Sequence, residues 1–215
     1  MIKIAPSILA ADLLNLQKEV SEVDRAGADY IHIDVMDGNY VPNITFGPDI
    51  VKKLRTITNK ILDVHLMINP VSKFIEDFVN SGADIISFHP ETEKNVNKTI
   101  QKIKDLNCKC GLAIHPDVRI TDIKQYLNLV DLVIVMTVVP GFGGQKFQIE
   151  QIDKISELKK IKSIKNLNFE IEVDGGINND TAKLCIDKGA DILVAGTYIF
   201  NKPCEEYKNL INSLK

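Results

Sequence analysis

The chain has 215 residues, of which 45% are hydrophobic and 26% charged, so it can bury a sizeable core as an ordinary globular protein. A net charge of −3 without a basic run argues against nucleic acid and membrane surfaces as partners, and the apolar run at 132–139 is too short to span a bilayer. The four cysteines show neither metal-binding spacing nor disulfide density, so we expect reduced thiols and a cytoplasmic location.

Eight short runs rich in isoleucine, leucine and valine predict eight buried β-strands. In chain order they are residues 2–7, 30–34, 60–66, 85–89, 109–115, 131–136, 169–174 and 192–196. A Gly-Ala-Asp turn precedes three of these runs, at Gly27, Gly82 and Gly189, and each turn follows an amphipathic stretch. Glycine suits the left-handed position that ends a helix, and the β-branched run after it suits a buried parallel strand. The amphipathic stretches, at 13–26, 71–81 and 181–188, are therefore predicted helices.

Eight strand–helix units in this length leave roughly 27 residues for each, which is close to the minimum for a parallel crossover. The sequence therefore predicts an α/β protein with a single (β/α)₈ barrel domain over residues 1–215. An open doubly wound sheet is less favoured because no glycine-rich turn follows the first strand. Residues 36–48 and 139–147 are interpreted as long loops after strands, where barrels carry their chemistry.

Four ionisable residues lie near the ends of three predicted strands. His32 and Asp34 are two positions apart on one strand face, His65 ends the third strand, and Asp174 ends the seventh. Because the ends of barrel strands converge on one mouth, these side chains can meet, and burying them without a charge partner would cost several kcal/mol. Mixed imidazole and carboxylate ligands suit one divalent metal ion, Zn²⁺, Mn²⁺, Fe²⁺ or Co²⁺, and the ligand set does not choose among them.

Glycines after the sixth, seventh and eighth strands predict a phosphate site. Glycine lets backbone N–H groups approach an anion closely, and barrels often bind phosphate at the loops after strands seven and eight. The candidates are Gly141, Gly143, Gly144, Gly175, Gly176, Gly196 and the adjacent Thr197.

Six segments of the chain form a recognisable set, and they are residues 5–10, 32–38, 41–43, 63–67, 140–145 and 173–177. In their order, spacing and position on the barrel, the chain resembles ribulose-phosphate 3-epimerases from end to end. The resemblance implies a TIM barrel of the ribulose-phosphate-binding type. It also implies a metal-dependent isomerase of the pentose phosphate pathway that interconverts D-ribulose 5-phosphate and D-xylulose 5-phosphate at C3.

The resemblance also implies individual roles. His32, Asp34, His65 and Asp174 would bind the metal, and Asp34 and Asp174 would be the two acid/base groups that act through an enediolate. The implied contacts to the ketose phosphate are Ser7, His65, Met36, Met67, Met136, Gly141, Phe142, Gly143, Gly144, Gly175, Gly176, Gly196 and Thr197.

Three positions depart from the family pattern, and they bear on substrate preference. The family usually has an asparagine at the position of Val139 and commonly has an asparagine at the position of His115. Thr197 occupies a position where serine is more frequent. An allulose-6-phosphate 3-epimerase therefore stays open as an alternative, while Asp34 and Asp174 argue against a non-catalytic phosphosugar-binding barrel. His89 and His115 are interpreted as outer-rim or loop-anchoring residues. The sequence identifies no subunit interface, so a homo-oligomer also stays open.

Overall fold

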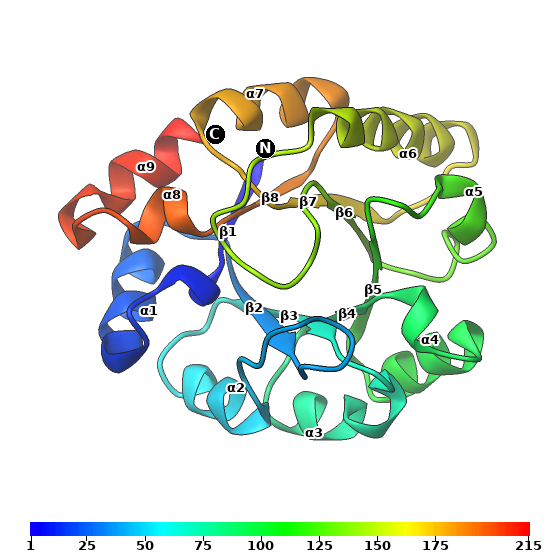
Figure 1. Cartoon of the computed structure of the whole chain (residues 1–215), viewed down its shortest axis with the longest axis horizontal. Helices are drawn as coiled ribbons and strands as arrows, with labels where there is room; N and C mark the ends of the chain where they lie inside the picture. Colours follow the sequence, from blue (N-terminus) through cyan, green and yellow to red (C-terminus); the bar gives the residue numbers. More distant parts are fainter.

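The computed structural model describes residues 1–215 and contains one eight-stranded parallel sheet that forms a TIM barrel, as the sequence predicts (Figure 1). The strands are β1 (Lys3–Pro6), β2 (Tyr30–Met36), β3 (Ile61–Met67), β4 (Ile85–Phe88), β5 (Lys109–Ile114), β6 (Leu132–Met136), β7 (Glu170–Asp174) and β8 (Ile192–Ala195). From β2 to β8 each strand pairs with the next, and β1 pairs with β8. A single parallel bridge between Ser7 and His32 joins the β1 end to β2 and brings the barrel to closure.

The helices form an outer ring around the strands (Figure 1). They are α1 (Leu16–Arg25), α2 (Pro48–Arg55), α3 (Ile75–Asn80), α4 (Val96–Asp105), α5 (Ile120–Ile123), α6 (Ile152–Ile164), α7 (Asn179–Lys188), α8 (Thr197–Phe200) and α9 (Tyr207–Ser213). The helices predicted at 13–26 and 71–81 each begin with a separate 3₁₀ turn, at Leu13–Asn15 and Val71–Lys73. None of the helices is long and apolar enough to cross a bilayer.

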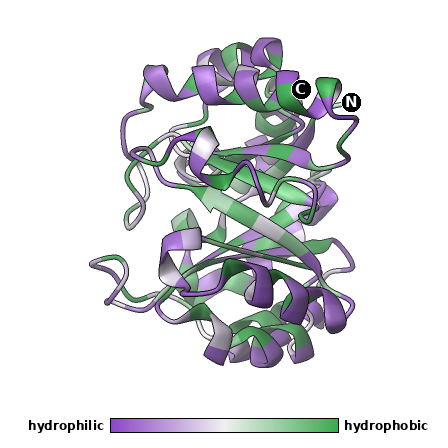
Figure 2. Cartoon of the chain, turned by 90° about the vertical axis from the view of Figure 1, so that its right-hand side faces the viewer, coloured by the Kyte–Doolittle hydropathy of each residue, from purple (hydrophilic) through white to green (hydrophobic).

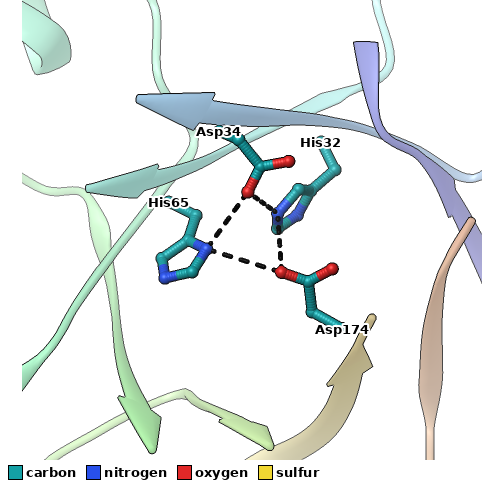
Figure 3. Close-up of side chains that lie close together, drawn as sticks. All are labelled: His32, Asp34, His65 and Asp174. Atoms are coloured by element: carbon teal, nitrogen blue, oxygen red, sulfur yellow. Dashed lines mark ion pairs between the residues drawn. The ribbon is translucent and has the colours of Figure 1, made fainter. Parts of the chain in front are cut away.

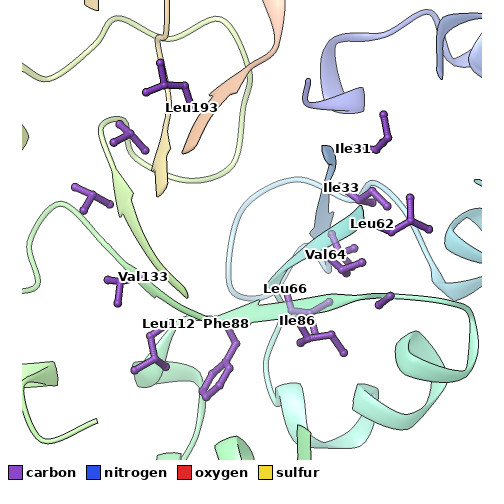
Figure 4. Close-up of a cluster of buried hydrophobic side chains, with 14 of the residues drawn as sticks. Ile31, Ile33, Leu62, Val64, Leu66, Ile86, Phe88, Leu112, Val133 and Leu193 are labelled. Carbon is purple, nitrogen blue, oxygen red and sulfur yellow. The ribbon is translucent and has the colours of Figure 1, made fainter. Parts of the chain in front are cut away.

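Most of the core lies between the barrel and the helices. Alternate residues of each strand point outward, so Ile31 and Ile33 of β2 pack beside Val64 and Leu66 of β3 in one large buried cluster (Figure 4). Figure 2 shows the same division, with mainly hydrophobic strands inside helices that carry hydrophilic surfaces. The intervening residues point into the barrel, and this inward set includes the ionisable residues of β2.

The Gly-Ala-Asp turns have a second role that the sequence did not indicate. Gly27, Gly82 and Gly189 have φ values of +97°, +103° and +110°, which confirms the predicted left-handed helix ends. The aspartate that ends each turn accepts a hydrogen bond from a backbone N–H near the start of the strand before that turn. An equivalent aspartate precedes β6, so the pattern occurs four times. The N–H groups of Ile4, Leu62, Cys110 and Ile171 donate to Asp29, Asp84, Asp131 and Asp191, respectively.

Each of these aspartates also pairs with a basic residue. The partners are Lys215 for Asp29, Arg55 for Asp84, Lys104 for Asp131 and Lys162 for Asp191. All four aspartates lie before the first residue of a strand, at the opposite end of the barrel from the strand termini that carry the candidate site. Residues at that end of such barrels serve stability, which leaves the other end free for chemistry.

Candidate metal centre and active site

The four ionisable residues predicted to meet do come together at the C-terminal ends of the strands (Figure 3). His32 and Asp34 lie on β2, His65 on β3 and Asp174 at the end of β7. In the β2–β3 ladder Asp34 is the register partner of His65, so the two side chains start at the same height. The inward face of β2 thus supplies two residues, the neighbouring β3 supplies the third, and β7, separated from β2 by β1 and β8, supplies the fourth.

One atom from each residue faces a common point. Asp34 Oδ1 lies 3.3 Å from both His32 Nε2 and His65 Nδ1. Asp174 Oδ2 lies 3.6 Å from His65 Nδ1 and 3.9 Å from His32 Nε2, and all four atoms lie within 4.8 Å of one another. Both of these ring nitrogens are buried without a hydrogen-bond partner. Two imidazole nitrogens and two carboxylate oxygens in this arrangement fit a transition-metal ion.

The electrostatics of the cluster require positive charge at this point. Burial by itself raises the pKa of Asp34, but the adjacent His32 and His65 outweigh it and hold that pKa well below its usual range. Burial likewise lowers the pKa of His65, but the adjacent carboxylates of Asp174 and Asp34 outweigh it and raise the pKa to about 9. Protons on the imidazoles can meet this demand, and so can a bound cation, which would displace them.

A second, deeper group of acids supports His32, and sequence reasoning missed it. His32 Nδ1 lies 2.7 Å from Asp63 Oδ2 and 3.2 Å from Glu172 Oε1, and all three side chains have no solvent exposure. Burial and the nearby charge of Asp63 raise the pKa of Glu172 to about 8. Metal-binding histidines usually donate their second N–H to such a carboxylate. The available signal was spacing, because Asp63 and Glu172 each lie two residues before a predicted ligand, on the same strand face.

His89 lies on the far side of His65, where the interpretation as an outer-rim residue is wrong. The side chain is fully buried, and its Nε2 is 3.0 Å from His65 Nε2. Burial and the nearby His65 and His115 lower the pKa of His89 well below its ordinary value, so the ring is neutral. Strand β4 ends one residue earlier, and the chain turns there into a 3₁₀ helix at Pro90–Thr92, which aims the ring inward.

A pocket opens directly above the cluster, at the mouth of the barrel. Most of the predicted substrate contacts line it, and they are Ser7, Met36, Met67, Met136, Gly141, Phe142, Gly143, Gly144, Gly175, Gly176, Gly196 and Thr197. Asp34 and Asp174 form part of its lining, whereas His32 and His65 lie beneath it. Sequence reasoning did not single out seven further lining residues, Leu9, Ala10, Val138, Pro140, Gln145, Ile177 and Val194.

Hydroxyl groups hold both aspartates in place. Ser7 Oγ donates to Asp34 Oδ2 at 2.6 Å, which leaves Oδ1 facing the histidines. Directly after β6, the Thr137 hydroxyl contacts the carbonyl oxygens of Asp174 at 3.0 Å and Gly175 at 2.6 Å, and its N–H donates to the Asp174 carbonyl. The Thr137 contacts therefore fix the chain at the end of β7, where the carboxylate leaves the strand.

The glycine loops pack against one another at the side of the pocket near β6, β7 and β8. Gly176 has a φ of +65°, and a Cβ built there would lie 2.8 Å from the backbone nitrogen of Phe147. A Cβ on Gly175 would lie 2.5 Å from Val138 Cγ2, so both positions require glycine. The N–H groups of Gly144 and Gly176 donate to no backbone carbonyl. They are therefore free to donate to an anion in the pocket.

Two of the three departures from the family pattern lie outside this pocket. Val139 and His115 line a separate groove with Tyr40 and Glu91, while Thr197 lies in the pocket itself. The separation means that neither Val139 nor His115 changes the lining of the central site.

Comparisons with known proteins agree on one family and one fold. The model of the ribulose-phosphate 3 epimerase family matches residues 3–200. A ribulose-phosphate 3-epimerase of Bacillus subtilis (strain 168) is 47% identical over 203 residues, which is 94% of each chain. The enzyme of the same name from Escherichia coli (strain K12) is 41% identical over 214 residues, covering 99% of this chain and 94% of that one. A chloroplastic ribulose-5-phosphate-3-epimerase of Arabidopsis thaliana is 44% identical and covers 100% of this chain and 76% of its own length.

Solved structures at lower identity share the fold. KGPDC from Streptococcus mutans superimposes with a TM-score of 0.73 at 16% identity, covering 100% of this chain and 95% of that one. Orotidine 5'-phosphate decarboxylase from Pyrococcus horikoshii OT3 superimposes with a TM-score of 0.69 at 18% identity, covering 98% of each chain. At these identities the similarity supports the barrel architecture alone.

Proposed function

The chain belongs to the ribulose-phosphate 3-epimerase family and is an isomerase, and from this membership we propose that it inverts C3 by proton transfer between two carboxylates. The reaction would interconvert D-ribulose 5-phosphate and D-xylulose 5-phosphate. One observation carries the proposal. Asp34 from β2 and Asp174 from β7 both line the pocket, and each presents one oxygen to the same two imidazole nitrogens.

Inversion requires that a proton leave one face of the carbon and that another arrive at the opposite face. A single carboxylate does not easily reach both faces of a planar enediolate, so two groups from different strands are an economical solution. We assign Asp34 to remove the C3 proton of D-ribulose 5-phosphate and Asp174 to protonate the other face, with the roles exchanged in reverse. Asp34 lines the pocket, and its lowered pKa keeps the carboxylate ionised, which is the form that a general base needs.

The proton next to a ketone is far less acidic than a carboxylic acid. A divalent cation (Zn²⁺, Mn²⁺, Fe²⁺ or Co²⁺) held by His32, Asp34, His65 and Asp174 would supply Lewis-acid stabilisation of the enediolate. Asp63 would keep His32 oriented with Nε2 toward the cation, and Ser7 would keep Asp34 from rotating away.

The rest of the pocket is suited to hold the ketose phosphate and exclude water. Met36, Met67 and Met136 are almost fully buried beside the cluster, where their weakly polar side chains limit the water that could protonate the enediolate. The free N–H groups of Gly144 and Gly176 are suited to the phosphate. We also propose that residues 1–215 form one domain and that the enzyme works in the cytoplasm, where its four free cysteines would stay reduced.

Deuterium exchange tests the two-carboxylate mechanism directly. In D₂O, Asp174→Asn should exchange the C3 proton of D-ribulose 5-phosphate without inverting the carbon, and Asp34→Asn should exchange only that of D-xylulose 5-phosphate. Both variants should lose epimerisation, while Asp187→Asn, an exposed change on α7, should keep it. Metal content measured on each variant separates loss of a proton carrier from loss of the cation. Full epimerase activity in either active-site variant would end the two-carboxylate account.

A further inference from the structure

The imidazole of His65 is connected to the surface of the barrel mouth by a chain of polar side chains. His65 Nε2, on the side away from the metal cluster, lies 3.0 Å from His89 Nε2. His89 Nδ1 lies 3.6 Å from Glu91 Oε1, and the Tyr40 hydroxyl donates to the same oxygen at 2.7 Å. These four side chains come from β3, the end of β4, the 3₁₀ helix after β4 and the loop after β2.

The geometry fixes the direction in which the protons of this chain point. If His65 Nδ1 faces a cation with its lone pair, the ring proton must be on Nε2, where it donates to His89 Nε2. His89 Nε2 then acts as acceptor, so the proton of that neutral ring is on Nδ1, which has Glu91 as its nearest charged neighbour. His89 Nδ1 is buried and has no hydrogen-bond partner, so the Glu91 carboxylate 3.6 Å away is the acid that faces it. The Tyr40 hydroxyl therefore donates to the Glu91 carboxylate from one side, and the Nδ1–H of His89 faces the same oxygen from the other side at 3.6 Å.

The two metal-facing imidazoles differ in whether a carboxylate contacts them directly on the side away from the cluster. His32 contacts two buried carboxylates directly, those of Asp63 and Glu172. His65 contacts no carboxylate on its outer side, and Glu91 is the acid that reaches it, through His89. Acidic partners behind a ligating histidine fix its tautomer and orientation and raise its basicity as a ligand.

We propose that Glu91 is a positioning residue for the metal ligand His65, acting through His89, and that Tyr40 holds Glu91 in place. The inference rests on the proposed metal centre and adds a residue that touches neither the cation nor the ketose phosphate. Tyr40 strengthens the connection because its ring also packs against that of His89, with centroids 4.9 Å apart. The loop after β2, which borders the mouth, is thereby tied to one ligand of the centre.

Cobalt titration of the metal-stripped protein tests this role, because Co²⁺ bound by imidazole and carboxylate groups reports its coordination in the visible spectrum. Glu91→Ala should weaken Co²⁺ affinity by about tenfold, the lower end of the effect of outer partners on metal sites, and should alter the spectrum. Glu91→Gln keeps an oxygen that can accept from His89 and should restore most of the affinity. Asp117→Ala is the matched control, since it removes a 91% exposed carboxylate that lies next to His115 and contacts none of the four residues from His65 to Tyr40.

The melting temperature of the metal-free proteins shows whether Glu91 acts only through the fold. Equal melting temperatures with weaker Co²⁺ binding in Glu91→Ala alone support the positioning role. Unchanged affinity and spectrum in Glu91→Ala, or an equal loss in Asp117→Ala, overturn it while the metal centre stands. Wild-type protein that takes up no Co²⁺ contradicts the metal centre and this role together.

Discussion

Asp63 offers a sharp test of the proposed metal centre because it contacts His32, a proposed ligand, and is not itself one of the four proposed ligands. Its Oδ2 lies 2.7 Å from His32 Nδ1, and neither side chain has any exposure to solvent. Asp63→Asn keeps the size of the side chain and removes its charge, so the Nδ1–H of His32 would face a weaker acceptor. The change should therefore reduce metal affinity while the four ligands stay in place.

The magnitude follows from the type of bond. A buried hydrogen bond to a charged group contributes about 1.5–3 kcal/mol, and about 1.4 kcal/mol corresponds to a tenfold change in affinity. Losing the charge should thus weaken metal binding by roughly 10- to 100-fold, the range found for partners behind metal ligands. Because Asp63 helps to raise the pKa of Glu172, its neutralisation lets Glu172 ionise and replace part of the lost charge. The double variant Asp63→Asn/Glu172→Gln should therefore bind metal more weakly than either single variant.

Competition between the metal-stripped protein and a chromophoric chelator, with Zn²⁺ or Co²⁺, measures this affinity. Asp77→Asn, an exposed position on α3, serves as the control and should match the wild type. Circular dichroism of each metal-free variant checks that the barrel is intact. A folded Asp63→Asn variant with wild-type affinity would refute the idea that the buried acid tunes His32.

Two further changes separate the phosphate loop from the structural end of the barrel. Gly176→Ala places a Cβ 2.8 Å from the Phe147 backbone at a φ of +65°, so KM for the ketose phosphate should rise at least about tenfold in steady-state assays. Gly47→Ala has open space around its Cβ and is the control, and an unchanged KM in Gly176→Ala would contradict the assignment. Asp84→Ala deprives the Leu62 N–H of its acceptor and should lower the free energy of unfolding by about 1–3 kcal/mol in urea titrations. A loss of metal affinity in that variant would show that the two ends of the barrel are not independent.

The sequence was sufficient to predict the barrel and the meeting of His32, Asp34, His65 and Asp174 at its mouth. Buried strands show as runs of β-branched residues, and the Gly-Ala-Asp turns mark where helices end. The spacing of His32 and Asp34 gives their common face, and the parallel sheet carries the ends of β2, β3 and β7 to one mouth. Each of these inferences needs only local periodicity and the rule that parallel strands end on the same side.

Only the tertiary structure determined the neighbours behind the ligands. His32 contacts Asp63, which is 31 residues away in the sequence, and His65 contacts His89, which is 24 residues away. Local patterns give the face on which a side chain lies, but its partner on the neighbouring strand depends on the strand register, which pairs His32 with Asp63. His89 shows the limit, because the sequence alone placed it at the rim, and the turn after β4 sends it into the core. Local sequence thus predicts the four residues of the cluster, whereas the contacts behind their imidazoles depend on the register between neighbouring strands.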